Sequence, residues 1–599
     1  MKPQSNVFVL TTLAFTVLVI GSWAGGNNTT GGEEVPDPCL FLAPCEPVPF
    51  RDDDSDVDFP VQFSEIAEPG LGDPFNSKAW GMAWWQGRLY VSTARAHYCV
   101  ETAVLADEGA PGFKYPPLDE ELTCTPQVED LPLAAEIWRY TPPFDSWERV
   151  FVSPEDVPIP GSPGKFTARD AGFRNLLPFT DLDGTQALYA FGVTSEVLFG
   201  FEEAGMRVPP RILRTTDGVN WAPVPQDPGT VLGDLGRGQA NFRAAAVFRG
   251  RLYVVVGELR GGGSVLEASD PAGGNNNFQF VTPSDLKVYE MAVFNDLLYV
   301  GTDSLSFGGG GQEGYVVAKT DATGPIPYTF DVVIDKGAYR QGLVSNAVVS
   351  MFVYDPCADT QASASACGPH LYIGTDKPAE LVRLDESDQL ELIVGKLRLE
   401  SPFGPLRPLS GFQGGYSDPL NEHIWRMQGH DTNEGRILFV GTNDLRGFLK
   451  GYQVFQFFLD FKFTGFDLAA SFDGIEHTIL TRTGFGGEVH QVGGASPMLE
   501  LPPKQLDVGI RVFASTPWGL FFGTSNPFDG LRVYKDNQLG GDVDKNGQVD
   551  ELDIALIQEA VGGAASGPAD RRDLNGDGRI SEEDLIIGLG ECTNPRCRP

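Results

Sequence analysis

A short apolar strand, usually ending in glycine, recurs seven times along this chain and constrains the fold more than any other feature. Its copies read LYVST at 89, LYAFG at 188, LYVVVG at 252, LYVGTD at 298, LYIGTD at 371, LFVGTN at 438 and LFFGTS at 520. Several have an upstream partner strand and hairpin turn, and a further strand usually follows. Units of about four strands bury both sheet faces on neighbouring units in a β-propeller. We interpret each copy as the inner strand of one blade, so the repeat predicts a mainly β, insert-rich propeller over residues 61–537, with seven blades.

The units are longer than a compact blade of about 45 residues, so some must carry insertions. The clearest insertion spans residues 96–135. The segment VQFSEIAEPG, which begins at Val61, is predicted to be an outer strand that joins the last blade and closes the ring. A second repeated motif, D-P-x-N-x-x-x-W-x-M, occurs at residues 73–82 and 418–427. A six- or eight-bladed ring and a pair of β-sandwiches are the alternative folds.

Two acidic twelve-residue loops follow the repeats. A calcium loop places oxygen ligands at positions 1, 3, 5, 7, 9 and 12 and glycine at position 6, which Gly547 and Gly578 occupy. The hydrophobes at position 8, Val549 and Ile580, fit a short strand that pairs two such loops. These oxygen ligands favour two Ca²⁺ ions, because Mg²⁺ prefers a tighter octahedron with retained water. The ligand positions hold Asp542, Asp544, Asn546, Gln548 (carbonyl), Asp550 and Asp553 in the first loop, and Asp573, Asn575, Asp577, Arg579 (carbonyl), Ser581 (through water) and Asp584 in the second.

Tandem loops of the form D-x-[DN]-x-[DN]-G-x-[VI]-x-x-x-D-[LI], each followed by one helix, resemble a type I dockerin. The resemblance covers residues 540–592 and implies a small helical domain that folds with calcium and docks onto a cohesin module of a scaffold or cell-surface protein. Dockerins of cellulose-degrading complexes often carry Ser-Thr at positions 10 and 11, the two positions that recognise the cohesin. This chain departs from them with Glu551-Leu552 and Glu582-Glu583, which argues against a cellulosomal partner.

The first residues have the order of a secretory signal peptide: Lys2, an apolar run over residues 7–20 and a small-x-small site ending at Ala24. We expect residues 1–24 to be removed and the protein to be secreted, either extracellular or associated with the cell surface, with no membrane span after cleavage. Residues 25–60 read as a linker rich in Gly, Asn and Asp, and residues 593–599 as a tail.

Eight cysteines agree with an oxidising compartment. The absence of a CxxC spacing argues against metal thiolate sites. Nearest-neighbour pairing is preferred among many connectivities and would give Cys39–Cys45, Cys99–Cys124, Cys357–Cys367 and Cys592–Cys597. The formal net charge of -37 argues against nucleic acid as a partner, because phosphates would be repelled.

Aligning the repeats where the chain enters the inner strands gives one column of bulky residues. Ligands of propellers gather at the mouth of the central channel, and aromatic rings and Arg forks suit sugars, carboxylates or sulfates. The same positions can instead fill the gaps between blades. The fifth and seventh units align too poorly to extend the column, which consists of Trp80, Arg174, Arg243, Tyr289 and Trp425.

The segment NEHIWRMQGHD gathers charged residues that could do acid–base work or hold a metal, although their spacing matches no metal motif. They are Glu422, His423, Arg426, His430 and Asp431. Two hypotheses follow for the whole chain. The first is a non-catalytic secreted propeller that binds a ligand, such as an acidic glycan, and is tethered by its calcium module. The second is a carbohydrate-active enzyme, a glycoside hydrolase or polysaccharide lyase, that acts in polysaccharide breakdown and is delivered by the same module.

Overall fold

The computed structural model describes residues 59–110, 113–117, 122, 124–259, 261–303, 314–342, 344–357, 367–445, 465–485, 507–594 and 597. The predicted signal peptide and most of the predicted linker, including Cys39 and Cys45, lie outside the described residues. No helix among the described residues is long and apolar enough to cross a membrane.

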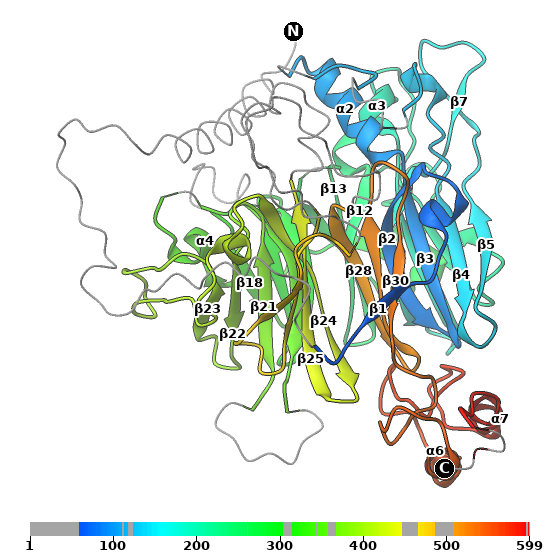
Figure 1. Ribbon diagram of the computed structural model, residues 1–599. Helices are drawn as coiled ribbons and strands as arrows, with labels where there is room; N and C mark the ends of the chain where they lie inside the picture. Colours follow the sequence, from blue (N-terminus) through cyan, green and yellow to red (C-terminus); the bar gives the residue numbers. More distant parts are fainter. Residues whose placement is uncertain are drawn as a thin grey trace, which may run out of the picture.

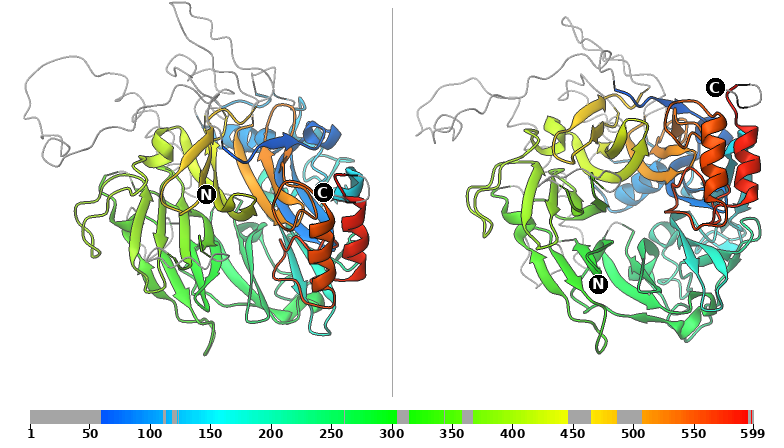
Figure 2. Two further views of the ribbon diagram at one scale, coloured as in Figure 1. Left: turned by 60° about the horizontal axis from the view of Figure 1, so that its bottom comes forward. Right: turned by 90° about the horizontal axis from the view of Figure 1, so that it is seen from below.

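The described residues form seven four-stranded antiparallel sheets around a common axis, so the predicted seven-bladed propeller is confirmed (Figures 1 and 2). Each innermost strand contacts the innermost strands of both neighbouring blades. From the axis outward, the first four blades are β2 (Asn76–Trp85), β3 (Arg88–Arg95), β4 (Glu136–Thr141), β5 (Ser146–Val152); β8 (Gly172–Thr180), β9 (Gln186–Val193), β10 (Ile212–Thr215), β11 (Ala222–Pro223); β12 (Asn241–Phe248), β13 (Arg251–Gly257), β14 (Gly263–Ala268), β15 (Phe278–Phe280); and β16 (Val288–Phe294), β17 (Leu297–Thr302), β18 (Val317–Thr320), β19 (Asp331–Ile334).

The last blade is completed by the first strand of the chain, as the sequence predicts. Strand β1 pairs antiparallel with β30, with Phe63 opposite Asp536. The ring is therefore closed by hydrogen bonds between the two ends of the β region. In order from the axis, the remaining three blades are β20 (Val348–Tyr354), β21 (His370–Thr375), β22 (Leu381–Leu384), β23 (Leu390–Val394); β24 (Asn421–Thr432), β25 (Gly435–Asp444), β26 (Leu468–Ser471), β27 (Thr478–Thr481); and β28 (Gly509–Thr516), β29 (Gly519–Ser525), β30 (Val533–Asp536), β1 (Phe63–Glu65).

The recurring motif strand is not the innermost strand of its blade, which corrects the sequence-based assignment. It is the second strand, and its upstream hairpin partner lines the axis: β12 precedes the motif strand β13, for example. The second strand lies between two neighbouring blades and is almost entirely buried, so its sequence is uniformly apolar. The innermost strand faces the channel along part of its length, and its more varied sequence hides the repeat.

The hydrophobic core lies between the faces of adjacent blades. Tyr189 and Phe191 of β9 pack in one cluster with Phe242 of β12 and Val254 of β13. Further clusters of the same kind join blades four and five and blades six and seven. Because each blade buries both faces on its neighbours, the core is a ring of layers rather than a single centre.

The predicted insertion in the first blade is present and carries helix α2 (His97–Asp107) between β3 and β4. The small sheet of β6 (Val157–Pro158) and β7 (Phe166–Thr167) and the short helices α3 (Glu196–Phe199) and α4 (Lys336–Tyr339) belong to other connections. In Figure 1, α2 and α3 lie on one face of the ring, and the C-terminal helices α6 (Glu551–Ala560) and α7 (Glu582–Gly590) lie on the opposite face.

The repeated motif D-P-x-N-x-x-x-W-x-M forms the same local structure in both of its copies. In both copies the Asn side chain donates to a glycine carbonyl six residues earlier: Asn76 Nδ2 to Gly70 O and Asn421 Nδ2 to Gly415 O, each at 3.0 Å. Both glycines have positive φ, a conformation that glycine adopts without steric cost. The motif therefore fixes how the chain enters the innermost strands of blades one and six.

Candidate functional sites: a channel ring and a calcium-loop module

Every innermost strand carries a β-bulge at the same level of the ring. In β2, for example, Ala79 pairs with Thr93 and Gly81 pairs with Ser92, which leaves Trp80 as the extra residue. A bulge inserts a residue that the ladder does not pair and redirects its side chain. The seven bulged positions, here named the channel ring, are Trp80, Arg174, Arg243 (with Ala244), Tyr289, Val349, Trp425 and Arg511.

The channel ring contains the whole column found in the sequence and adds two residues to it. The five sequence-selected residues lie within strands and not on the loops that enter them, which corrects that part of the expectation. Blade five contributes Val349 and blade seven contributes Arg511. Arg511 stands nine residues before Leu520, the spacing that also separates Arg243 from Leu252. This shared spacing is a sequence signal that could have identified Arg511 despite the weak alignment of its unit.

Three arginine–aromatic pairs join neighbouring blades across the ring. The guanidinium carbon of Arg174 lies 4.7 Å from the centre of the Trp80 ring. The corresponding distances are 3.8 Å from Arg243 to Tyr289 and 5.0 Å from Arg511 to Trp425. Cations are attracted to aromatic faces at such distances. Each pair therefore links two blades and fixes the direction of one guanidinium group.

The three ring arginines are buried and keep unused donors. Their exposed fractions are 8% for Arg174, 7% for Arg243 and 5% for Arg511. The Nη2 atoms of Arg174 and Arg243 both donate to the carbonyl of Leu259, at 3.0 and 2.8 Å. Nε of all three arginines and Nη1 of Arg511 have no hydrogen-bond partner among the described residues. Burial lowers the pKa of Arg174 and Arg511 well below its ordinary value, and neighbouring arginines add to that shift.

Further charges surround the ring. Lys78 lies 5.4 Å from the Trp425 ring centre, and burial lowers its pKa to about 8. Arg426 is paired with Glu290 through Nη1 and Oε2 at 3.1 Å. Glu422 accepts from Lys377 Nζ at 2.7 Å. Arg426 and Lys377 therefore already have carboxylate partners, in contrast to the three ring arginines.

Helix α2 brings a histidine against the ring from the inserted segment. The His97 imidazole contacts Trp80 edge to face, with ring centres 5.1 Å apart, and its Nε2 lies 3.1 Å from Glu101 Oε1. Burial, assisted by Lys78, lowers the pKa of His97 to about 4. The structure also joins Cys99 of α2 to Cys124, and Cys357 to Cys367.

The charged residues of the segment NEHIWRMQGHD do not form one site. Glu422, His423 and Arg426 lie at the channel end of β24, where His423 stacks on Trp425. His430 lies further along the strand, bonded to Ser515 Oγ and Gln538 Oε1. Among the described residues, the one group of three His, Cys, Asp or Glu residues whose ligand atoms lie within 4.8 Å of one another is in the first acidic loop. The segment therefore has no described metal site.

The first acidic loop holds its carboxylates in a shape that fits a cation. Asp542, Asp544 and Asp553 form the group just described. Both oxygens of Asp542 accept backbone N–H groups, from Asn546 and Gly547 at 3.0 Å. The two oxygens of Asp553 accept N–H groups from residues 543, 544 and 550. The backbone thus orients clustered like charges that an oxygen-seeking cation would neutralise, so this set fits calcium.

The second loop repeats the arrangement residue by residue. Asp573 accepts from the N–H groups of Asp577 and Gly578 at 3.1 and 2.9 Å. Asp584 accepts from Asn575 and Ser581 N–H groups. Asp550 and Ser581 also cap the helices α6 and α7 that follow the two loops. The same side chains therefore shape each loop and start its helix.

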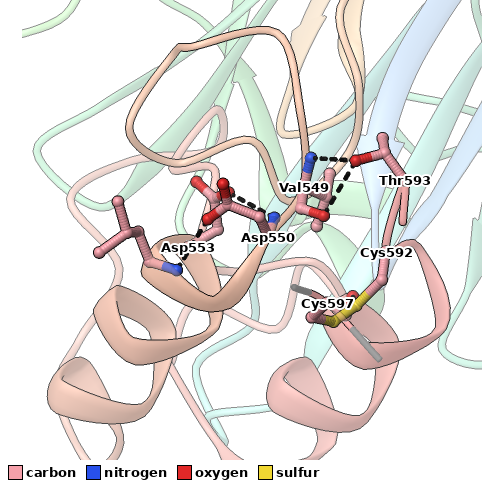
Figure 3. Close-up of a disulfide and its surroundings, with 8 residues drawn as sticks. Val549, Asp550, Asp553, Cys592, Thr593 and Cys597 are labelled. Atoms are coloured by element: carbon pink, nitrogen blue, oxygen red, sulfur yellow. Dashed lines mark hydrogen bonds between the residues drawn. A yellow bond between two sulfur atoms is a disulfide. The ribbon is translucent and has the colours of Figure 1, made fainter. Parts of the chain in front are cut away.

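The position-8 hydrophobes do not pair with each other, which corrects the expectation of a short strand between the loops. Val549 instead bonds to Thr593, which follows α7, through N–H and carbonyl groups (Figure 3). Ile580 bonds to Gly562 and Gly563, which follow α6. Each loop is thus tied to the segment that follows the other loop's helix. The structure joins Cys592 to Cys597 beside this contact (Figure 3).

The calcium-loop module, residues 540–594, packs directly on the propeller face opposite α2 (Figures 1 and 2). It rests on hairpin turns of blades one, six and seven. Trp518 Nε1 donates to the carbonyl of Leu574 at 3.2 Å, and a Cβ added at Gly87 would lie 2.5 Å from the carbonyl oxygen of Asn575. Ile557 and Leu574 share one core cluster with propeller residues that include Trp518. The two parts therefore share a hydrophobic core.

The fold and these loops define the class of the protein: a seven-bladed β-propeller that carries a tandem calcium-loop module. Residues 540–587 match the family model described as Dockerin type I domain. This C-terminal segment is a type I dockerin domain. No curated protein matches the chain.

Among solved structures, three similar chains show how distant the likeness is. The computationally designed Ika8 protein is 9% identical over 79% of this chain and 99% of its own, with a TM-score of 0.33. The exo-beta-1,3-galactanase from Phanerochaete chrysosporium is 9% identical over 49% and 60%, with a TM-score of 0.22. Zg3597, a family 117 glycoside hydrolase produced by the marine bacterium Zobellia galactanivorans, is 13% identical over 50% and 86%, with a TM-score of 0.25. At these scores none of the three bears on function.

Proposed function

We propose that this protein is a secreted β-propeller that a calcium-loaded dockerin domain attaches to a cohesin-type module or cell-surface scaffold. The observation that carries the proposal is the pair of matched acidic loops within a segment that fits the dockerin family. The two loops supply ligands for two Ca²⁺ ions, one from residues 542–553 and one from residues 573–584. Calcium would neutralise the clustered carboxylates and so hold the loops and both helices in place.

The helices of the module present an apolar surface to a partner. Leu552 and Ile586 are 61% and 69% exposed, and Leu556 and Leu589 lie on the same two helices with 38% and 51% exposure. Exposed apolar residues gathered on one small domain mark an interaction surface. Glu551, Glu582 and Glu583 are exposed beside them. We propose that the partner contacts these apolar side chains and carries complementary positive charge.

The proposed organisation follows from these parts. Residues 1–24 act as a signal peptide, residues 25–60 as a linker, residues 61–537 as the propeller, residues 540–592 as the calcium module and residues 593–599 as a tail. Export agrees with the disulfides that the structure contains, because disulfides persist in oxidising compartments. The protein is then displayed outside the cell, either free or attached to its scaffold.

The channel ring is the proposed ligand site of the propeller, with an acidic glycan as the ligand. This proposal is supported by cationic groups that face the axis of a strongly acidic protein. The alternative of a glycoside hydrolase needs a protonated carboxyl that donates to the leaving group. Burial raises the pKa of Glu422, but Lys377 and His423 outweigh burial and hold the pKa below its ordinary value. Glu422 therefore remains ionised and does not supply that proton.

The experiment that tests docking uses the exported full-length protein and a panel of purified type I cohesin modules. We expect capture by at least one cohesin in millimolar calcium, with loss of capture after chelation. Leu552→Ser combined with Ile586→Ser should weaken capture, whereas Phe144→Ser, on an exposed turn of the propeller, should leave it unchanged. Failure of the whole panel to bind the calcium-loaded protein would refute a cohesin partner. A glycan array probed with the same preparation tests the ligand class.

A further inference from the structure

We propose that Arg174, Arg243 and Arg511 form a built oxyanion site in the channel ring, which takes a carboxylate or sulfate group of the ligand. This inference rests on the proposed ligand-binding role and sharpens it. It assigns recognition of the anionic group to the arginines and adds Arg511 from blade seven. The aromatic residues of the ring then hold these arginines in position.

The first argument is charge. None of the three ring arginines has a carboxylate within ion-pair distance among the described residues, although each is more than nine-tenths buried. The neighbouring acidic side chains are engaged elsewhere: Glu290 with Arg426, Glu422 with Lys377 and Glu101 with His97. Burying an unpaired charge is costly, and the cost is largest where like charges gather. A negative group bound between the arginines removes that cost.

The second argument is the set of unused donors. Nη2 of Arg174 and Nη2 of Arg243 converge on the carbonyl oxygen of Leu259, which brings two cations side by side. Their Nε atoms, and Nε and Nη1 of Arg511, have no partner within the described part of the chain. Buried donors are nearly always satisfied by protein, water or ligand. Four such donors from three strands around one axis match the several acceptor oxygens of a carboxylate or sulfate.

The third argument concerns the aromatic rings. A sugar ring stacks on an aromatic face that is free, but the faces of Trp80, Tyr289 and Trp425 each carry a guanidinium group. Lys78 approaches Trp425 as well. The aromatic residues therefore hold the arginines in position, and sugar stacking on them is not expected. The ring recognises an anionic group, and neutral glycans should not bind to it.

The test measures binding of defined anions to the full-length, calcium-loaded protein by isothermal titration calorimetry. The probes are sodium sulfate, citrate and oligogalacturonate, with neutral oligogalactose as the comparison and chloride held constant. We expect saturable binding of at least one anionic probe at one site per chain, and no binding of the neutral oligosaccharide. Absence of saturable binding by all three anions would overturn the proposal.

Variants then assign the site. Arg511→Gln and Arg174→Gln should each weaken anion binding at least tenfold, and Arg511→Lys should weaken it less than Arg511→Gln because charge is kept. Arg249→Gln is the matched control, since Arg249 is also stacked on an aromatic ring, Phe248, but lies on the exposed rim. Equal affinity in wild type and Arg511→Gln would overturn the proposal. If Arg511→Gln fails to fold, the proposal is judged from two measurements. These are anion binding by the wild type and the affinity of Arg511→Lys relative to the wild type.

The outcomes separate this inference from the proposed function. Sulfate or citrate binding without oligogalacturonate binding would keep the oxyanion site and reject a uronate glycan as its ligand. Capture by a cohesin depends on the opposite face of the molecule, so it should be unchanged in Arg511→Gln. If no cohesin captures the wild-type protein, docking is refuted and the oxyanion site is unaffected.

Discussion

Arg571 of the dockerin domain donates through Nη1 to Oδ1 of Asn433, in the β24–β25 turn of the propeller, at 2.8 Å. The same Nη1 atom donates to the carbonyl of Asp542, also at 2.8 Å, and Asn433 Nδ2 donates to Asp542 Oδ2 at 3.1 Å. Asp542 is the first residue of the first calcium loop. The propeller therefore takes part in shaping that loop, and the module is a fixed part of the molecule rather than a tethered appendage.

We predict that Arg571→Ala lowers the free energy of unfolding by about 3 kcal/mol, because it leaves buried acceptors without a donor. Arg571 is only 6% exposed and also donates to Gln538 Oε1 and to the carbonyl of Asp431. Urea unfolding in saturating calcium measures the effect. Arg572→Ala is the control: Arg572 bonds to Asp570 within the module, so a loss of about 1 kcal/mol or less is expected. Equal losses in both variants would contradict a bridging role.

Calcium removal should destabilise the propeller as well as the module, because Leu574 and Ile557 belong to the core cluster that contains Trp518. We expect a chelator to abolish the helical circular dichroism of α6 and α7 and to lower the melting temperature of the β-sheet signal. Asp542→Ala and Asp573→Ala should each reduce the calcium stoichiometry from two ions to one in calorimetric titration. Glu559→Ala, on the exposed side of α6, should keep both sites. Two ions bound by Asp573→Ala would show that the second loop is not a site.

Phe63→Ala should open the ring at its closure. Phe63 of β1 contacts Phe439 and Phe522 at ring-centre distances of 5.8 and 5.1 Å, and so fixes the strand that completes the last blade. We expect a loss of about 2–3 kcal/mol on unfolding, below the range for a fully buried phenylalanine because Phe63 is partly buried. Phe144→Ala, at a site that is 79% exposed, should change stability by less than about 0.5 kcal/mol. Chemical denaturation of both variants checks the difference.

Acid should weaken the region around the channel ring through His97. Its pKa is lowered from 6.5 to about 4 in the folded protein, so the folded state favours the neutral ring. The stability from this group is complete above about pH 6.5 and is lost as the pH falls towards 4, by up to about 3 kcal/mol. The variant His97→Gln should lack this pH-dependent part of the unfolding free energy. Unfolding free energies of both proteins between pH 7 and 4 measure it, and parallel curves would contradict the prediction.

Much of the architecture could be predicted because it depends on local pattern. The seven second strands are buried on both faces, so their apolar sequence repeats visibly. The calcium loops place every ligand at a fixed offset, and Gly547 and Gly578 adopt the positive φ that the sharp turn needs. These features are set within short stretches of chain.

The remaining features depend on contacts between distant segments. A hydrophobe at position 8 predicts burial but not its partner, so the pairing of Val549 with Thr593 was not foreseen. The bridging role of Arg571 is equally invisible, because its partners lie in another domain. The channel ring was found in part: the long connection between β20 and β21 hid Val349 of blade five, and Arg511 of blade seven was missed although it keeps the nine-residue spacing.

The closure by β1 also sets the order in which the molecule is completed. Gln62 donates to Asn537 across 475 residues, and β30 ends just before the dockerin domain begins. A chain that folds as it emerges from its N-terminus must keep β1 unpaired until β30 has also emerged. Ring closure is therefore a late event when folding begins at the N-terminus. The last blade stays incomplete until the residues just before the dockerin domain are in place.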